Sequence, residues 1–367
     1  MHSVLILGAG KIGSTIAGLL ATSGDYRVVL ADARPDAARM TQARLNGGVG
    51  PEVISALQLD AGDPNTLKAA LHEHGVAAVI SGLPYALNPA VARVARLAGV
   101  HYFDLTEDIA STTTVVAIAA GAKTAFVPQC GLAPGFVNIV AADLMNRLTS
   151  CDYARLRVGA LPRNPDNVLR YALTWSTEGL INEYGNPCLA VVDGRVTEVA
   201  PLQGLEALTL DGTNYEAFNT SGGLATLPDT FHGRVRSLDY KTIRYPGHCE
   251  LVSFLMNDLR LNEDRDTLRR ILERALPTTQ DDVVVLHVEV SGRRGNAPAT
   301  ELHSKTFYPK VIGGHRWTAI QWTTAAAVCA VVDLVLQAPQ QFAGAVRQER
   351  FALEDFLANR FGGLCRK

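Results

Sequence analysis

The sequence lacks the short motifs that mark several common classes of protein. Its six cysteines include no pair with C-x-x-C spacing, and no H-E-x-x-H segment occurs, so nothing indicates a zinc site or a redox-active disulfide. We therefore expect buried free thiols, as in a reducing cytoplasm, and no bound metal. No Y-x-x-x-K segment occurs either, which disfavours a short-chain dehydrogenase.

Charge of either sign is nowhere concentrated. The chain has 34 Lys and Arg against 36 Asp and Glu, a net charge of −2, so we expect no nucleic-acid or membrane partner. Only three residues precede the first apolar run, and none of them is Lys or Arg, so we expect no signal peptide. The most apolar later stretch, 324–336, is interrupted by Asp333 and is shorter than the roughly 20 residues that span a bilayer. We therefore expect a cytoplasmic protein.

A glycine-rich turn near the N-terminus separates a predicted strand from a predicted helix. Residues 4–7 are all apolar, as in the buried centre of a parallel sheet, and Gly8, Gly10 and Gly13 follow at G-x-G-x-x-G spacing. These glycines allow a tight turn, close approach of a pyrophosphate, and close packing of helix on strand. We predict a dinucleotide site; the alternative is a glycine-rich turn in an unliganded α/β domain.

An acidic residue follows the second predicted strand. Asp32 comes directly after residues 27–31, at the place where a carboxylate accepts hydrogen bonds from the adenosine ribose and repels a 2′-phosphate. Asp32 therefore favours NAD. Arg34 either pairs with a 2′-phosphate, which keeps NADP open, or is a solvated loop charge.

Strands and helices alternate over the first 130 residues, which predicts a parallel sheet with helical crossovers. The expected strands are 4–7, 27–31, 53–59, 77–81, 101–105 and 125–128, and the expected helices include 67–74, 89–98 and 112–120. Ligands of such sheets bind beyond the carboxyl ends of the strands. The candidates that follow strands there are Ser81, Tyr85, Asp104, Thr106, Glu107, Gln129 and Cys130.

The pattern changes after residue 130, where period-two segments and hairpin turns replace the alternation. Residues 189–199 read as a hairpin with Asp193 and Gly194 at the turn, and 283–290 and 301–308 read as two strands joined by a loop. Residues 265–275 and 323–336 read as helices. We predict a Rossmann-type α/β domain (1–129), a mainly antiparallel α+β substrate and dimerisation domain (130–322), and C-terminal helices (323–367) that return to the first domain.

Several segments together resemble one family. These are the glycine motif and SGLPYALNP, YFDLTED, VPQCGLAPGFVN, STEGLINEYGNP, TSGGLATLPDTF and LDYKTIRYPGH. The combination resembles the saccharopine dehydrogenase-like proteins, most closely their lysine 6-dehydrogenase branch, over about residues 4–330. The resemblance implies an NAD(P)-dependent oxidoreductase that acts on a C–N bond of an amino acid, and it implies a homodimer.

The resemblance also ranks the activities. Saccharopine-forming relatives tend to carry G-L-D-P-G where this chain has Ala133 between Leu132 and Pro134. Because Ala133 supplies no carboxylate, the favoured reaction is oxidative deamination of the ε-amine of L-lysine. The alternatives are a saccharopine-, opine- or carboxyspermidine-type reductase that joins an amine to a carbonyl, and a non-catalytic dinucleotide sensor.

The predicted site residues divide into three groups, each with a structural alternative. Tyr85 is a proton relay or a packing aromatic. Asp104 and Glu107 are bases or helix caps. Arg244 binds a substrate carboxylate or forms an internal salt bridge. The catalytic candidates are Tyr85, Asp104, Glu107, His232 and Lys241; the cofactor-binding ones are Gly8, Gly10, Lys11, Ile12, Gly13, Asp32, Arg34, Asp60, Ser81, Pro84, Gly131 and Leu132; the substrate-binding ones are Thr106, Gly135, Arg244, Tyr245 and His248. His232 and His248 are acid–base candidates or structural histidines. Cys130 reads as a packing residue rather than a nucleophile.

Overall fold

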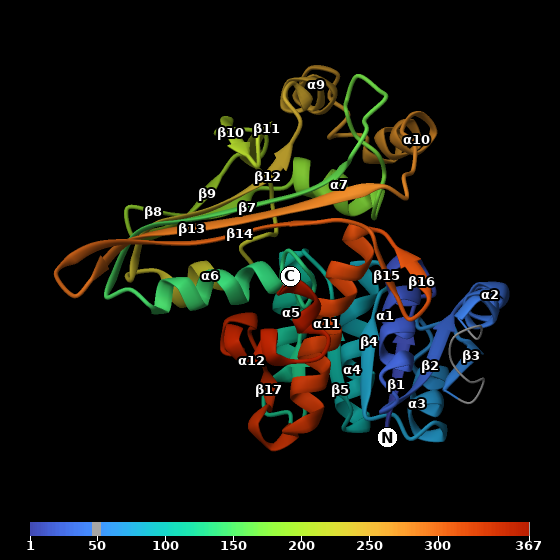
Figure 1. Ribbon diagram of the computed structural model, residues 1–367. Coiled ribbons are helices and arrows are strands. Elements are labelled where there is room, and N and C mark those ends of the chain that lie inside the picture. Colours follow the sequence, from blue (N-terminus) through green and yellow to red (C-terminus); the bar gives the residue numbers. More distant parts are fainter. Residues whose placement is uncertain (46–52, 367) are drawn as a thin grey trace. The chain divides into compact units, whose positions relative to one another are not determined.

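The computed structural model describes residues 1–45 and 53–366, and this part of the chain divides into two compact units (Figure 1). The first unit contains residues 1–136, 310–317 and 321 onward, and the second contains 137–309 and 318–320. The first unit is therefore built from both ends of the chain, while most of the second unit is continuous.

A parallel sheet forms the centre of the first unit, in the order β17-β6-β5-β4-β1-β2-β3. Its strands are β1 (His2–Leu7), β2 (Tyr26–Asp32), β3 (Ile54–Gln58), β4 (Ala78–Ser81), β5 (His101–Asp104), β6 (Ala125–Val127) and β17 (Gly344–Ala345). The strand order reverses between β1 and β4, which is the switch point where dinucleotides bind in such sheets.

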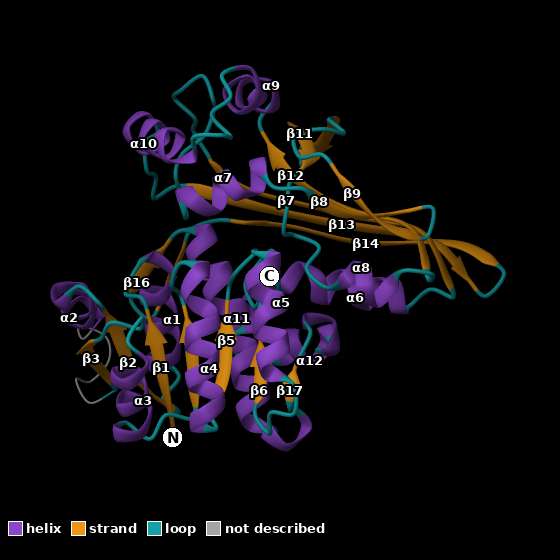
Figure 2. Cartoon of the chain, turned by 180° about the vertical axis from the view of Figure 1, so that it is seen from behind, coloured by secondary structure: helices purple, strands orange, loops and turns teal. Residues whose placement is uncertain are grey.

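Helices cover both faces of this sheet (Figure 2). They are α1 (Lys11–Thr22), α2 (Pro35–Leu45), α3 (Pro64–Glu73), α4 (Asn88–Ala98), α5 (Ile109–Ala119), α11 (Ala319–Gln337) and α12 (Leu353–Ala358). On one face, Leu67, Val91 and Val115 of α3, α4 and α5 form one core with Leu5 and Val29. Short 3-10 turns lie at η1 (Tyr85–Leu87), η3 (Pro339–Gln341), η4 (Gln348–Arg350) and η5 (Gly362–Cys365), and β15 (Lys310–Ile312) pairs with β16 (His315–Trp317).

Asp333 joins the C-terminal segment to the sheet of the first unit. Its side chain is buried, and it accepts hydrogen bonds from Tyr26 (2.5 Å), Asn359 (2.7 Å), Arg360 (2.8 Å) and Gln337 (2.9 Å). Four donors around one carboxylate offset the cost of burying its charge.

The helix that carries Asp333 is longer than the sequence indicated. By length and composition α11 could cross a membrane, but 78% of its apolar window is buried within the structure. The helix starts at Ala319, four residues before the predicted start, because a residue far away in the sequence caps it. Asp282 accepts hydrogen bonds from the backbone N–H groups of Ala319 (2.6 Å) and Ile320 (2.9 Å) and so caps the helix.

The second unit contains a mixed, mostly antiparallel sheet in the order β10-β11-β12-β7-β13-β14, with β8 on β12 and β9 on β8. Its strands are β7 (Ser150–Pro162), β8 (Cys188–Val192), β9 (Arg195–Val199), β10 (Glu206–Leu210), β11 (Thr213–Asn219), β12 (Val235–Arg244), β13 (Asp282–Arg294) and β14 (Ala297–Phe307). The two central strands, β7 and β12, are parallel, and the other paired strands are antiparallel. The predicted fold class is confirmed.

Two hairpins show how turn residues set the strand ends. The predicted turn at Asp193 and Gly194 is present, and both residues have positive φ (47° and 78°), as a two-residue hairpin turn requires. The predicted loop between β13 and β14 was too long. Pairing continues to Arg294 and Ala297, so that the turn is only Gly295 and Asn296.

Three helices of the second unit, α7 (Thr177–Gly185), α9 (His248–Ser253) and α10 (Arg265–Ala275), build a separate apolar core. The chain also forms α6 (Phe136–Asn146) and α8 (Leu227–Phe231), and the π-helical turn η2 (Phe254–Asp258) follows α9. Leu180, Val252 and Leu268 of α7, α9 and α10 pack with Phe218 of β11. The predicted bounds of α10 are confirmed, because its apolar residues recur at helical spacing and Asp264 caps its first turn.

Candidate functional site

The glycine motif forms a close-packed turn at the carboxyl end of β1. Gly8 has φ of +96°, and a Cβ placed there lies 2.9 Å from the carbonyl oxygen of Gly82. A Cβ on Gly13 lies 1.9 Å from the carbonyl oxygen of Gly8, so only glycine lets α1 pack this close to the turn. A Cβ on Gly10 meets no atom of the described residues within 4 Å, and none of their side chains caps α1. The uncapped N-terminus of α1 therefore fits the pyrophosphate of a dinucleotide.

Asp32 lies at the end of β2, beside this turn. Its carboxylate accepts hydrogen bonds from the backbone N–H groups of Ala9 and Arg34, both at 2.9 Å. The guanidinium of Arg34 lies 3.5 Å from the same carboxylate, and its side chain is 79% exposed. The side chain of Asp32 is only 13% exposed, and its two backbone donors hold it beside the glycine turn.

Asp104 joins two loops at the carboxyl edge of the sheet. This fully buried carboxylate accepts hydrogen bonds from the hydroxyl of Tyr102 (2.8 Å) and the N–H groups of Thr106 (3.0 Å) and Gln129 (3.2 Å). The carbonyl of Asp104 accepts a fourth hydrogen bond, from the N–H of Cys130 (2.8 Å). The contacts favour a structural role for Asp104, because the loops after β5 and β6 are fixed to it.

The burial of Asp104 predicts a pH dependence of stability. Burial raises the pKa of Asp104 from 3.8 to about 6, so folding favours its protonated form. This contribution to stability is fully present below about pH 4 and is lost as the pH rises through about 6, a change of about 3 kcal/mol. Asp104→Asn removes the titration. Denaturant unfolding between pH 4 and pH 7 should therefore show the wild-type protein losing stability relative to the variant; a constant difference would contradict this.

Other predicted residues lie around the same edge. Ser81 donates a hydrogen bond to the Asn88 side chain (2.7 Å), and both residues are buried. Tyr85 begins η1, with its carbonyl bound by Ser111 (3.0 Å). The cap of α5 is Asp108 rather than Asp104 or Glu107. The remaining predicted residues here are Lys11 and Ile12 at the start of α1, Asp60 in the turn after β3, Pro84 before η1, and the half-buried Glu107 with the buried Thr106.

The segment from Gly131 to Gly135 departs from the prediction. The N–H of Gly131 donates to the carbonyl of Pro134 (2.9 Å), so it is paired within the loop instead of facing a nicotinamide. A Cβ on Gly135 lies 1.9 Å from the carbonyl of Gly131, which explains the glycine there. Leu132 and Cys130 are buried, and burial raises the pKa of the Cys130 thiol, which fits a packing residue.

A second polar cluster lies within the second unit, around Arg244. Arg244 is buried, and its Nε donates to the hydroxyl of Tyr184 (2.9 Å). Its Nη1 donates to Thr242 Oγ1 (2.7 Å) and to the Ile243 carbonyl (2.9 Å), and its Nη2 lies 3.5 Å from Glu183 Oε2. The guanidinium also lies over the ring of Tyr171, 5.0 Å from its centroid. Arg244 therefore has the predicted internal ion pair, at a long distance.

His248 belongs to the same cluster and corrects the acid–base prediction. Its ring nitrogens contact Tyr184 Oη (2.9 Å) and the carbonyl of Leu169 (2.8 Å). Burial, and next the charge of Arg244, lower the pKa of His248 to about 3. A histidine with this pKa stays neutral near pH 7 and is no acid there. Tyr184 and Glu183 were not predicted, because only their place in the STEGLINEYGNP segment marked them.

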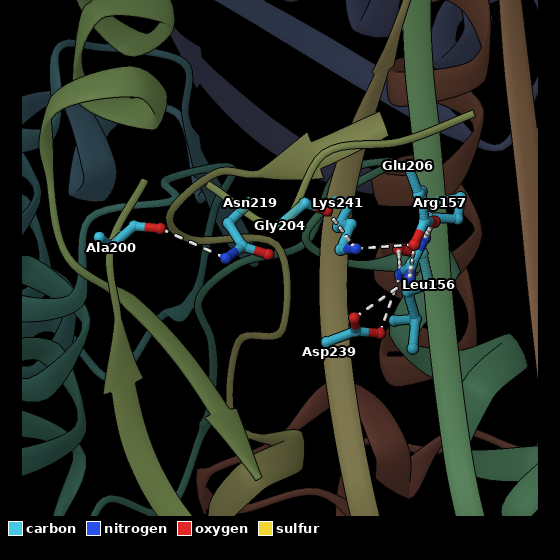
Figure 3. Close-up of polar contacts among 8 residues, drawn as sticks. All are labelled: Leu156, Arg157, Ala200, Gly204, Glu206, Asn219, Asp239 and Lys241. Carbon is cyan, nitrogen blue, oxygen red and sulfur yellow. Dashed lines mark hydrogen bonds and ion pairs between the residues drawn. The ribbon is translucent and has the colours of Figure 1, made fainter. Parts of the chain in front are cut away.

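Lys241 lies in an ion network on the sheet of the second unit (Figure 3). Its ammonium donates to Glu206 (2.7 Å) and to the carbonyl of Gly204 (2.6 Å). The buried Arg157 bonds Glu206 and also Asp239 (2.9 and 3.1 Å). These contacts favour a structural role for Lys241, in which two cations hold the start of β10 against β7 and β12.

His232 and Tyr245 also make local contacts. The exposed His232 has its Nδ1 2.8 Å from the carbonyl of Asp229, within its own helical turn. The hydroxyl of Tyr245 donates to the carbonyl of Pro162 (2.9 Å), and its ring stacks on Tyr215. Neither residue contacts Arg244 through a described hydrogen bond. Among the described residues no group of three or more His, Cys, Asp or Glu side chains is arranged to hold a metal.

The glycine turn, the uncapped helix and the strand order define the first unit as a dinucleotide-binding domain. Residues 4–127 match the family model of the saccharopine dehydrogenase NADP binding domain, and residues 131–361 match that of the saccharopine dehydrogenase C-terminal domain. The chain belongs to the saccharopine dehydrogenase family, as the resemblance predicted, and its cofactor is NAD(P).

Individual relatives are more distant. The chain is 26% identical over 205 residues to saccharopine dehydrogenase [NADP(+), L-glutamate-forming] of Pyricularia oryzae, covering 54% of this chain and 43% of that protein. It is 24% identical over 280 residues to the Saccharomyces cerevisiae protein of the same name, covering 72% and 60%. The chain thus spans about half the length of these curated relatives. The structure of apo saccharopine dehydrogenase (L-Glu forming) from Saccharomyces cerevisiae shares the fold, with a TM-score of 0.77, 18% identity and coverage of 95% and 94%.

Proposed function

We propose that this protein is an NAD(P)-dependent oxidoreductase that acts on a C–N bond of an amino acid, and that it oxidises the ε-amine of L-lysine. The observation that carries the choice of lysine is Ala133, half-buried in the loop between Gly131 and Gly135. Saccharopine-forming relatives tend to have aspartate in that loop, and alanine offers no carboxylate for a second amino acid.

The proposed reaction converts L-lysine, NAD(P)⁺ and water into the ε-aldehyde, ammonium and NAD(P)H. The nicotinamide, when bound, accepts the hydride from the carbon that bears the nitrogen. The chain must place that carbon, keep the amine neutral and activate water. We assign proton transfer to Tyr85 and Glu107, which are half-buried near the carboxyl edge of the first unit.

The choice of coenzyme is a separate proposal. Asp32 is fixed beside the turn after β1 and favours the ribose hydroxyls of NAD over a 2′-phosphate. The exposed Arg34 and the NADP binding domain of the family favour NADP. We propose NAD, because the Asp32 carboxylate is ordered by backbone donors whereas the Arg34 side chain is solvated.

A second candidate is reduction of an imine formed between an amine and a carbonyl compound. The names of both curated relatives favour it, since both are glutamate-forming saccharopine dehydrogenases. The two reactions differ in the compound that donates the hydride to NAD(P)⁺. For the first candidate this is the primary amine of L-lysine, and for the second it is saccharopine.

A direct assay separates these possibilities. The purified protein is mixed with NAD or NADP, and absorbance at 340 nm is followed with L-lysine, L-ornithine, 1,5-diaminopentane and saccharopine. We expect turnover of L-lysine with NAD and none with saccharopine. Turnover of saccharopine alone would establish the second candidate instead. Dinucleotide binding by calorimetry without turnover of any donor would contradict the lysine reaction and leave a dehydrogenase of another substrate or a sensor.

A further inference from the structure

One exposed helix of the first unit has the composition of a buried helix. In the described part of the chain, three helices are strongly apolar: α5, α6 and α11. α6 is buried apart from Asp143 and Asn146, and 78% of the apolar window of α11 is buried. α5 contains no Asp, Glu, Lys or Arg, yet five of its eleven residues are exposed. Because a surface helix of a globular protein normally carries charged residues on its outer face, α5 is an exception.

The exposed residues of α5 form one continuous face. They recur at i, i+1, i+4, i+7 and i+8, which places them on one side of the helix: Ile109, Ala110, Thr113, Val116 and Ala117. Ile109 is 43% exposed and Val116 is 40% exposed, whereas Val115 and Ala119 belong to the core beneath. α4 lies beside α5 (Figure 2), and its Leu97 is 79% exposed. Apolar surface of this kind marks an interaction site.

Charged residues lie at both ends of this face, with opposite signs. At the N-terminal end, the half-buried Asp108 caps α5 and accepts a hydrogen bond from the N–H of Ser111 (2.6 Å). At the C-terminal end, Lys123 is exposed, and Nη2 of Arg96 lies 3.9 Å from a Cβ placed on Gly121. The helix dipole favours this distribution, but it does not account for the lack of charge between the two ends.

We propose that the outer face of α5 is an interface between two copies of this chain, in which two α5 helices pack antiparallel across a twofold axis. In such a pair the same surface meets itself, so Asp108 of one copy lies opposite Lys123 of the other. The uncharged middle sets no like charges against each other, and the small side chains of Ala110 and Ala117 let the helices approach closely. The proposal is independent of the reaction, and it places self-association on the first unit instead of residues 130–322.

The size of the face sets the expected affinity. α5 is about 16 Å long, so two such helices with the adjoining ends of α4 bury less than the roughly 1,600 Å² of a standard interface. We therefore expect a reversible dimer with a Kd on the order of 10 μM. Analytical ultracentrifugation of the full chain between about 1 and 100 μM measures it. A protein that stays monomeric over this range would overturn the proposal.

Val116→Glu tests the surface, because it puts an unpaired carboxylate into the middle of the interface. We expect the Kd of the dimer to rise at least about 30-fold, since burying such a charge is costly. Val196→Glu is the matched control: this valine of β9, in the second unit, is 42% exposed. Both variants should keep the wild-type Tm. A dimer that survives Val116→Glu would overturn the proposal, and one that dissociates in Val196→Glu instead would put the interface on the second unit.

The charged ends give a second test. Lys123→Glu sets two acids against each other at each end of the pair, so the Kd at low salt should rise about three- to tenfold. Asp108→Asn keeps an N-cap on α5 and removes the charge, so adding it to Lys123→Glu should restore most of the affinity. Lys68→Glu, at an exposed lysine of α3, is the control and should change nothing. Lack of rescue by Asp108→Asn would overturn the antiparallel arrangement.

Cross-linking through Thr113→Cys needs no change of charge. Thr113 is the exposed residue nearest the middle of α5, and hence nearest the twofold axis, and the six native cysteines are buried. Oxidised glutathione should convert Thr113→Cys into a disulfide-linked dimer while Val196→Cys stays monomeric. A Thr113→Cys protein that forms no more covalent dimer than Val196→Cys would overturn the proposal.

Discussion

Replacing Gly13 with alanine should abolish most dinucleotide binding and destabilise the first unit as well. The new methyl carbon would lie 1.9 Å from the carbonyl oxygen of Gly8, so α1 and the turn after β1 must separate. Overpacking of this kind costs about 1–3 kcal/mol in stability, and the shifted N–H groups no longer converge on a pyrophosphate. We expect at least 100-fold weaker binding of NAD or NADP by calorimetry and a lower Tm.

Gly10→Ala is the informative comparison for that experiment. A Cβ there meets none of the described atoms within 4 Å, so the fold should tolerate it, although the methyl group occupies space at the N-terminus of α1 where the pyrophosphate fits. We expect Gly10→Ala to weaken dinucleotide binding with little change in Tm. Dinucleotide binding by Gly13→Ala at wild-type affinity would show that this turn is not the cofactor site.

Replacing Asp333 with alanine should produce the largest loss of stability. The variant removes the common acceptor of Tyr26, Asn359, Gln337 and the charged Arg360, all within 2.9 Å of a carboxylate that is 1% exposed. Removing one partner of a buried ion pair typically costs about 3–5 kcal/mol. Denaturant unfolding followed by tryptophan fluorescence measures this loss, since Trp317 and Trp322 both lie in the first unit.

Asp355→Ala is the matched control for Asp333→Ala. Asp355 is exposed in the first turn of α12, so its loss should cost less than about 1 kcal/mol through the helix dipole. If Asp333→Ala were no more damaging than Asp355→Ala, the C-terminal segment would not depend on this carboxylate.

The fold could be predicted where a local pattern decides the structure. The helix at Arg265–Ala275 and the turn at Asp193 and Gly194 follow from spacing and turn chemistry alone. The start of α11 could not be predicted, because its cap, Asp282, lies 37 residues before Ala319 in the chain. The turn at Gly295 and Asn296 was missed because the surrounding Arg and Gly residues are paired strand residues that read as a loop.

The same difference between local patterns and contacts far apart in the sequence applies to the candidate site. The glycine turn and Asp32 follow from the order of residues along 30 positions, and the structure places them together. The hydrogen bond of Arg244 to Tyr184 joins residues 60 positions apart, so neither this bond nor the effect of Arg244 on His248 could be read from the sequence. Lys241 looked like a catalytic candidate because the sequence does not show that Glu206 and Gly204 bind its ammonium.

Because the first unit is built from both ends of the chain, its parts are synthesised at different times. Residues 1–136 are synthesised before the second unit and contain six of the seven strands of their sheet, but β17 and nearly all of α11 are synthesised only after the whole second unit. Until then the nascent chain lacks the contact of Cys329 with Ile16 and the four hydrogen bonds to Asp333. Domains generally fold in the order of their synthesis. Here all residues of the second unit are synthesised before the first unit has all of its own. Residues 1–136 are therefore made well before the segment that completes their unit.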